Sequence, residues 1–304
     1  MSLLPALPAT RSLGAGAIPV SPIAWGMWRL AEDGRSATDA VALVHAALDA
    51  GITFLDTADI YGFDGSRGFG DAEALLGEVL AAEPGLRARI VLATKGGIRP
   101  PLPYDQSTEY IAEAIDASLR RLRLDTIDLW QVHRPDILAH PQEVARALDD
   151  AVAAGKVREL GVSNFTMPQI EALACFLGRP LAATQPEISP LRIDCFENGE
   201  LDQAMRMNLV PLAWSPLGGG RLLAPERARD TAVAAELDRI AAEQGVSRSV
   251  AAYGWLMAHP AGIIPIVGSQ SAGRIAEAAK ALSMRWTRQD WYAVLVAARG
   301  ERLP

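Results

Sequence analysis

Four residues in the first half of the chain have side chains that together could move a proton. They are Asp56, Tyr61, Lys95 and His133. A tyrosine hydroxyl has a reference pKa of about 10 and is a poor acid at neutral pH, but a neighbouring lysine lowers that pKa and an aspartate keeps the lysine charged. A neutral histidine can orient a substrate oxygen. Each residue alone has an ordinary structural explanation, whereas the set predicts a general acid directed at a developing alkoxide.

A second group of polar and aromatic residues is suited to hold a flat carboxamide. Ser163 and Asn164 are adjacent in Gly161-Val162-Ser163-Asn164-Phe165 and offer both donors and acceptors, which a carboxamide needs. Gln185 adds a third polar side chain, and Trp214 has a face on which a heterocycle can stack. Ser-Asn is also common in turns and a tryptophan is often a core residue, so this interpretation depends on the phosphate features that follow.

Two glycine-containing segments are typical of phosphate binding by backbone amides. The first, 215–221, is a glycine-rich turn that ends in an arginine, and the second, 268–274, follows a predicted strand and opens a helix. The second segment is similar to the first part of a nucleoside-triphosphate-binding loop. In such a loop the last glycine is followed by Lys and then Ser or Thr, whereas here it is followed by Arg274-Ile275, so a triphosphatase is disfavoured. The candidate phosphate residues are Ser215, Leu217, Gly218, Gly219, Gly220, Arg221, Gly268, Ser269, Gln270 and Arg274.

The elements that position these residues alternate between short apolar runs and longer amphipathic segments. We expect strands at 23–27, 52–55, 90–93, 127–132, 157–162, 181–184, 210–214 and 263–267. We expect helices near 38–50, 71–82, 108–123, 141–154, 167–176, 198–207, 231–245 and 271–282. Continuous apolar strands are typical of parallel sheets covered on both faces. Eight such units predict one α/β domain over residues 1–304, a (β/α)8 TIM barrel with additional helices near 248–258, before the eighth strand, and near 287–298 at the C-terminus.

In such a barrel, chemistry takes place at the carboxyl ends of the strands. Asp56 and Lys95 are 39 positions apart, and Lys95 and His133 are 38 apart, close to the average of 38 residues per unit for eight units in 304 residues. The candidate acid residues therefore fall at successive strand ends.

The composition excludes several classes of protein. The net charge of −7 and the absence of a basic block disfavour nucleic acids and anionic membranes as partners. Cys175 and Cys195 form no disulfide framework, and the four scattered histidines form no metal-binding pair. We therefore expect no metal. Residues 1–10 carry no basic export signal, so we expect a cytoplasmic protein.

The motifs, in this order, resemble those of the aldo-keto reductase family over nearly the whole chain. The resemblance implies a catalytic tetrad of Asp56, Tyr61, Lys95 and His133 on a barrel that binds NADPH. It implies that Ser163, Asn164 and Gln185 hold the nicotinamide carboxamide, that Trp214 stacks on the ring, that 215–221 binds the pyrophosphate and that 266–277 binds the adenosine 2′-phosphate. The implied cofactor contacts also include Gly26, Met27 and Glu277.

These observations predict an NADPH-dependent oxidoreductase that reduces a small-molecule aldehyde or ketone. Tyr61 is the expected general acid, and Trp28 is expected to form a wall of the substrate pocket with Tyr61 and His133. One alternative is a non-catalytic NADPH-binding redox sensor or regulatory subunit on the same fold. Another is a Schiff-base lyase that uses Lys95, which a nearby Asp56 disfavours because it keeps the lysine charged. The sequence leaves the substrate, the reaction direction and the oligomeric state open.

Overall fold

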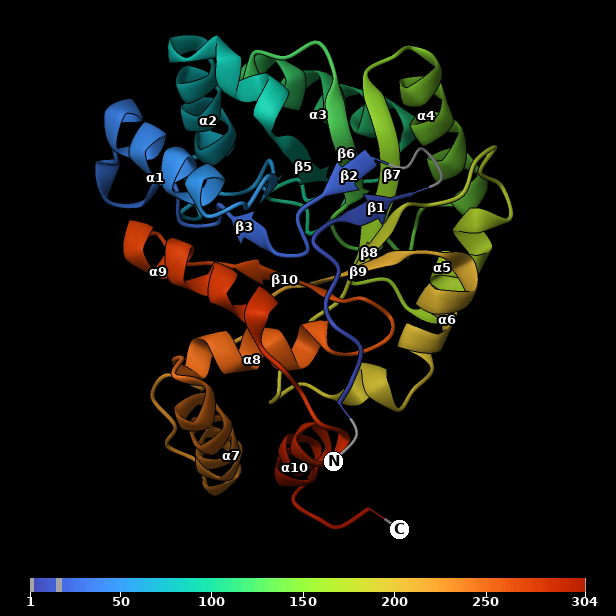
Figure 1. Cartoon of the computed structure of the whole chain (residues 1–304). Helices are drawn as coiled ribbons and strands as arrows, with labels where there is room; N and C mark the ends of the chain where they lie inside the picture. Colours follow the sequence, from blue (N-terminus) through green and yellow to red (C-terminus); the bar gives the residue numbers. More distant parts are fainter. Residues whose placement is uncertain (1–2, 15–17, 304) are drawn as a thin grey trace.

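Eight parallel strands close into a barrel in a computed structural model that describes residues 3–14 and 18–303 (Figure 1). Neighbouring strands follow chain order, and β10 pairs with both β9 and β3 to complete the ring. The barrel strands are β3 (Ala24–Gly26), β4 (Phe54–Asp56), β5 (Val91–Gly96), β6 (Ile127–Val132), β7 (Val157–Ser163), β8 (Ala183–Gln185), β9 (Val210–Ala213) and β10 (Ile264–Val267). The predicted (β/α)8 barrel is confirmed, and each strand lies within a few residues of its predicted position.

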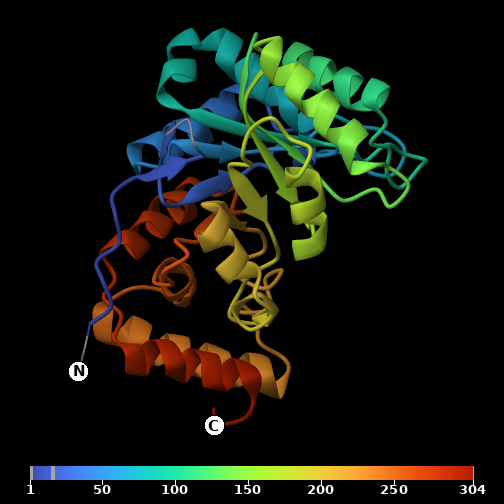
Figure 2. The same ribbon diagram turned by 90° about the vertical axis from the view of Figure 1, so that its right-hand side faces the viewer.

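Helices surround the barrel and connect successive strands (Figures 1 and 2). They are α1 (Ala37–Asp49), α2 (Asp71–Ala82), α3 (Thr108–Leu122), α4 (Pro141–Ala153), α5 (Met167–Ala174), α6 (Glu200–Met207), α7 (Ala228–Gln244), α8 (Arg248–Met257), α9 (Ala272–Ala278) and α10 (Arg288–Arg299). Short 3-10 helices lie at Glu32–Gly34, Pro84–Arg89, Asp194–Phe196 and Ala279–Ser283. Within the described residues, no helix combines the length and apolarity needed to cross a membrane.

Polar residues at the helix starts explain why several helices begin where they do. The side chains of Ser36, Ser107 and Thr287 accept hydrogen bonds from the backbone N–H groups of Asp39, Tyr110 and Asp290 at 3.1–3.3 Å. Each bond satisfies an N–H group that the first turn of a helix leaves without an intrahelical partner.

A hairpin that the sequence analysis did not predict lies across the amino-terminal end of the barrel. It pairs β1 (Arg11–Leu13) with β2 (Ile18–Val20) in antiparallel register. Leu13, Ile18 and Val20 are buried in one apolar cluster with the inward-facing Phe54 and Leu129 of the barrel (Figure 1). The hairpin therefore closes the end of the barrel opposite the carboxyl ends of the strands.

The two helices between β9 and β10 have different surroundings. Residues Val250–Met257 of α8 are all buried and this helix contacts β10, whereas α7 packs along α10 beside the barrel (Figures 1 and 2). The additional helices are present as predicted, but α8, expected to be the insertion, is the helix that covers the barrel. The sequence analysis missed this because α8 is buried on all sides and so lacks the amphipathic pattern expected of a helix that covers a barrel.

The contact between α2 and α3 generates a stability prediction. A Cβ atom on Gly77 would lie 2.0 Å from the carbonyl oxygen of Arg121, so alanine there would force the helices apart. We expect Gly77→Ala to lower the free energy of unfolding in urea by about 1–3 kcal/mol, although alanine is the better helix former. The control is Gly85→Ala, because nothing lies within 4 Å of its Cβ position. Equal stability of the Gly77 variant and the wild type would contradict this packing.

Candidate active site

A buried ion pair joins the ends of β4 and β5. Lys95 Nζ donates to Asp56 Oδ2 and to the carbonyl oxygen of Thr57, both at 2.7 Å, and the Lys95 side chain is 0% exposed. Gln185 Nε2 donates to the other carboxylate oxygen, Asp56 Oδ1, at 2.9 Å. Both oxygens of Asp56 and two donors of the lysine are therefore satisfied, as a buried charge pair requires.

Tyr61 and His133 complete the group of four that the sequence predicts. Tyr61 is half-buried on the turn after β4, with its ring centroid 4.9 Å from Lys95 Nζ. The Tyr61 and His133 rings lie 5.9 Å apart at an angle of 77°. The structure thus brings Asp56, Tyr61, Lys95 and His133 together at the carboxyl ends of neighbouring strands.

Burial and the Lys95 charge shift the pKa values of these groups. Burial acts to lower the pKa of Lys95, but Asp56 and Tyr61 outweigh it, and the net pKa lies above the ordinary 10.5. Burial raises the pKa of Tyr61, and Lys95 offsets part of this rise. Burial, then Lys95 and Arg134, hold the pKa of His133 well below 6.5. The site therefore contains an ammonium, a phenol and a neutral imidazole at neutral pH.

The four residues predicted to hold a carboxamide lie next to this group. Ser163 Oγ donates to the carbonyl oxygen of Gln185 at 2.9 Å, and Asn164 Nδ2 donates to the carbonyl oxygen of His133 at 3.0 Å. Trp214 Nε1 donates to Asn164 Oδ1 at 3.0 Å, which fixes the plane of the indole. Hydrogen bonds therefore connect the predicted carboxamide residues to one another and, through Gln185, to Asp56.

The glycine-rich loop after β9 has the backbone conformation that its glycines permit. Gly218, Gly219 and Gly220 have φ values of +62°, +66° and +93°, in the left-handed region that favours glycine. Arg221, predicted to contact a pyrophosphate, instead donates from Nε to Asp230 Oδ2 of α7 at 2.9 Å. Its guanidinium therefore anchors the loop to α7 in this structure.

The segment after β10 lies against the end of β3. Gln270 Nε2 donates to the carbonyl oxygen of Gly26 at 3.1 Å, and the indole of Trp25 donates to the carbonyl oxygen of Ser269 at 2.9 Å. Arg274 is exposed in the first turn of α9 and forms no ion pair among residues 3–14 and 18–303. These contacts place residues 268–274 beside β3, and the Arg274 guanidinium has no acidic partner among the described residues.

Three further predicted positions differ in how accessible they are. The Met27 side chain is fully buried in the apolar cluster that includes residues of the surrounding helices, so only the backbone of Met27 can face a ligand. Glu277 is half-buried on α9. Trp28 follows β3 and is 65% exposed, so its side chain lies on the surface and not in the core. In the part of the chain described, no group of three or more His, Cys, Asp or Glu residues could hold a metal ion.

Two buried polar residues near the site were missed from the sequence. Gln131 is 0% exposed, pairs in register with Lys95, and neither its side-chain oxygen nor its nitrogen has a partner among the described residues. Asp59 is 1% exposed and both of its carboxylate oxygens also lack partners in the same residues. Gln131 was detectable, because a residue two positions before His133 points to the same side of a strand. Nothing in the sequence around Asp59 distinguishes it from a turn residue.

Comparison with known proteins identifies the family. The sequence model of the aldo/keto reductase family matches residues 22–295. The chain belongs to the aldo/keto reductase family. It is an oxidoreductase, and members of this family generally bind NADP(H).

Individual aldo-keto reductases are similar over nearly their full lengths. A 6-dehydroglucose reductase of Novosphingobium aromaticivorans is 76% identical over 304 residues, which cover 100% of both chains. A 6-dehydroglucose reductase of Agrobacterium fabrum is 39% identical over 296 residues, 94% of this chain and 97% of the relative. The solved structure of a glycerol dehydrogenase from Gluconobacter oxydans matches with a TM-score of 0.83 and 28% identity, covering 95% of each chain.

The lowered pKa of His133 predicts its behaviour in acid. Its imidazole stays neutral through pH 6.5, where a free histidine is half protonated, so its Cε1–H resonance is expected to stay constant from about pH 8 to about pH 6.5 in an NMR titration. The unfolded chain binds the proton first, so this histidine destabilises the fold as the pH falls below 6.5. The resonance of His133 is identified as the one that disappears from the spectrum of the His133→Asn variant. An inflection near pH 6.5 would contradict the burial and charge argument.

Proposed function

We propose that this enzyme uses NADPH to reduce the C6 aldehyde of 6-dehydroglucose, forming glucose. The support for the substrate is the 76% identity over the full length to a reductase of that name, together with the 39% identical relative of the same name. The observation that carries the chemistry is the buried Asp56–Lys95 pair beside Tyr61. Both the substrate and the proton donor are open to direct tests.

The residues of the site fit the nicotinamide half of the proposed cofactor. Ser163 and Asn164 have the donor and acceptor types that a carboxamide needs, and the carboxamide would exchange with the hydrogen bonds that Asn164 now makes to Ser163 and to the carbonyl oxygen of His133. The Trp214 indole is oriented by its hydrogen bond to Asn164. Each of these three residues is connected to His133 or to Asp56 by one hydrogen bond or by two in series. The residues that would hold a nicotinamide therefore lie next to the predicted catalytic group.

The phosphate half fits the backbone of two loops. The left-handed glycines of 218–220 allow backbone amides to approach a pyrophosphate closely, and Ser269 and Arg274 are suited to the 2′-phosphate. Arg221 would contact a phosphate only if it exchanged its bond to Asp230 for one to the cofactor.

The reaction needs a hydride at the carbonyl carbon and a proton at its oxygen. The hydride would come from NADPH, when it is bound by the residues named above. Tyr61 donates the proton from its hydroxyl to the carbonyl oxygen, the C=O double bond becomes a C–OH single bond, and the Lys95 ammonium stabilises the phenolate that remains. The neutral imidazole of His133 donates a hydrogen bond to the same oxygen and so orients the aldehyde. Solvent then returns a proton to Tyr61.

The proposed substrate is tested by steady-state oxidation of NADPH. We expect kcat/KM for 6-dehydroglucose to exceed that for propanal by about 100-fold or more, because a site that hydrogen-bonds sugar hydroxyls leaves its polar groups unpaired when they are missing. Equal efficiency with the two aldehydes would contradict the sugar assignment, although not the reductase chemistry. Absence of turnover with every aldehyde, combined with tight NADPH binding, would favour the redox sensor.

The role of Tyr61 is tested by removing its hydroxyl. We expect Tyr61→Phe to lower kcat by about 10²–10⁴-fold, the usual contribution of a general acid, while NADPH binding measured by tryptophan fluorescence remains unchanged. Tyr292→Phe is the matched control, because Tyr292 lies on the surface of α10, away from the site. Unchanged turnover of the Tyr61 variant would remove this residue from the acid role.

A further inference from the structure

A cavity of about 710 Å³ lies away from the candidate active site. It is bounded by residues 4–8, by the carboxyl end of α8 and by α10, near the hairpin that closes the amino-terminal end of the barrel. Among the described residues, none of those assigned above to catalysis or to cofactor binding lines it. Its volume is in the range of about 300–1,000 Å³ that is typical of small-molecule sites.

One wall of the cavity is aromatic and rigid. The rings of Trp255 and Trp291 stack with centroids 5.0 Å apart and planes 14° apart, and each indole N–H donates to the backbone carbonyl of the other tryptophan at 3.0 Å. Phe196 packs against both rings, at 5.1 and 5.7 Å. Phe196 and Trp291 line the cavity and so present a fixed apolar surface to it.

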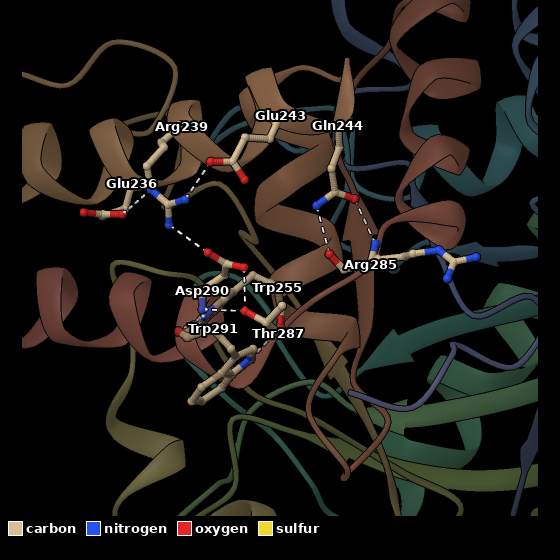
Figure 3. Close-up of polar contacts among 9 residues, drawn as sticks. All are labelled: Glu236, Arg239, Glu243, Gln244, Trp255, Arg285, Thr287, Asp290 and Trp291. Atoms are coloured by element: carbon tan, nitrogen blue, oxygen red, sulfur yellow. Dashed lines mark hydrogen bonds and ion pairs between the residues drawn. The ribbon is translucent and has the colours of Figure 1, made fainter. Parts of the chain in front are cut away.

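Contacts with α7 hold this wall in place. Arg239 of α7 donates to Asp290 at 2.9 Å, next to Trp291 in α10 (Figure 3). Gln244 exchanges two hydrogen bonds of 2.9 Å with the backbone of Arg285, just before α10 (Figure 3). A ligand that packs on the aromatic wall would therefore meet a surface that is already ordered.

The cavity also contains positive charge without a counter-ion. Arg11 is half-buried, and its Nη2 donates to the carbonyl oxygens of Ala261 and Gly262 at 3.3 and 3.0 Å. Neither Arg11 nor Arg288, which also lines the cavity, forms an ion pair with any acidic side chain in residues 3–14 and 18–303. The acidic residue of the lining, Glu197, is already paired with Arg299.

His259 supplies a neutral donor on the same lining. The backbone N–H of Ala261 donates to His259 Nδ1 at 3.2 Å, so the neutral imidazole carries its hydrogen on Nε2. Burial lowers the pKa of His259, which keeps this tautomer neutral. The lining thus combines an apolar platform with three donors, Arg11, Arg288 and His259, while its carboxylate, Glu197, is already paired with Arg299. This combination suits an anion with an apolar body.

We propose that this cavity is a second binding site, for a small organic anion whose ring packs on Phe196 and Trp291 and whose acidic group is held by Arg11 and Arg288. The site is independent of the reductase chemistry, because it lies at the other end of the barrel and uses none of its residues. Gly262 is part of it: a Cβ atom there would lie 1.2 Å from the Arg11 guanidinium, so glycine is what allows Arg11 to reach its place.

Two fluorescent probes with the same rings distinguish charge from apolar contact. The full-length enzyme is titrated with 1-anilinonaphthalene-8-sulfonate, which is anionic, and with N-phenyl-1-naphthylamine, which lacks the sulfonate. We expect saturable binding of the anion, and a dissociation constant about tenfold or more higher in Arg288→Met and in Arg11→Met, since each removes a charged donor. The neutral probe should bind these variants and the wild type equally.

Matched controls locate the site. Arg120→Met removes an exposed arginine of α3 that has no ion pair among the described residues, and Trp28→Ala removes the exposed aromatic residue at the other end of the barrel. Neither should change the affinity for the anion. Because Arg288 is exposed, its variant tests the proposal even if Arg11→Met fails to fold. Affinity that is unaffected by Arg288→Met, or that is lost in Trp28→Ala, would overturn the proposal.

Discussion

The ammonium group of Lys95 is a full positive charge in the interior of the barrel, and its environment limits how the surrounding strands can be arranged. Removing an ammonium from water costs several kcal/mol unless a partner compensates it. Asp56 and the Thr57 carbonyl provide that compensation, and Gln185 satisfies the remaining oxygen of Asp56. The three side chains come from β4, β5 and β8, so a slip of one residue in any of these strands would turn a member outward and leave a buried charge unpaired.

The same charge acts differently on the pKa values of the two neighbouring rings. Burial raises the pKa of Tyr61 and lowers that of His133, because both effects favour the neutral form. The Lys95 charge opposes the first shift and reinforces the second. It therefore makes the phenol a better proton donor while it keeps the imidazole neutral, and a neutral imidazole can orient an aldehyde without competing as an acid. Without Asp56, burial would favour an uncharged lysine and both effects would be lost.

The barrel and the proximity of Asp56, Tyr61, Lys95 and His133 could be predicted from the sequence because both follow from local patterns. Apolar runs mark strands buried on both faces, and polar residues that end such runs must converge when the strands are parallel. Contacts that depend on tertiary distance were not predictable: the bond from Gln185 to Asp56, the pairing of Arg221 with Asp230, and the contact of Gln270 with Gly26. The hairpin of β1 and β2 was missed because three-residue strands carry too little periodicity. The position of α8 was predicted, but the helix was interpreted as an insertion because, buried on all sides, it lacks the amphipathic pattern of a helix that covers a barrel.

The charge state of Lys95 tests the account most directly, and the chain has only three lysines, Lys95, Lys156 and Lys280. Enzyme labelled with ¹⁵N-lysine can be titrated by NMR from about pH 7 to about pH 12. We expect Lys95 Nζ to remain protonated above pH 10.5 in the wild type, and to lose its proton below that pH in Asp56→Asn, because burial then acts without the carboxylate that opposes it. Deprotonation of Lys95 below pH 10.5 in the wild type, or a titration that Asp56→Asn leaves unchanged, would contradict the account.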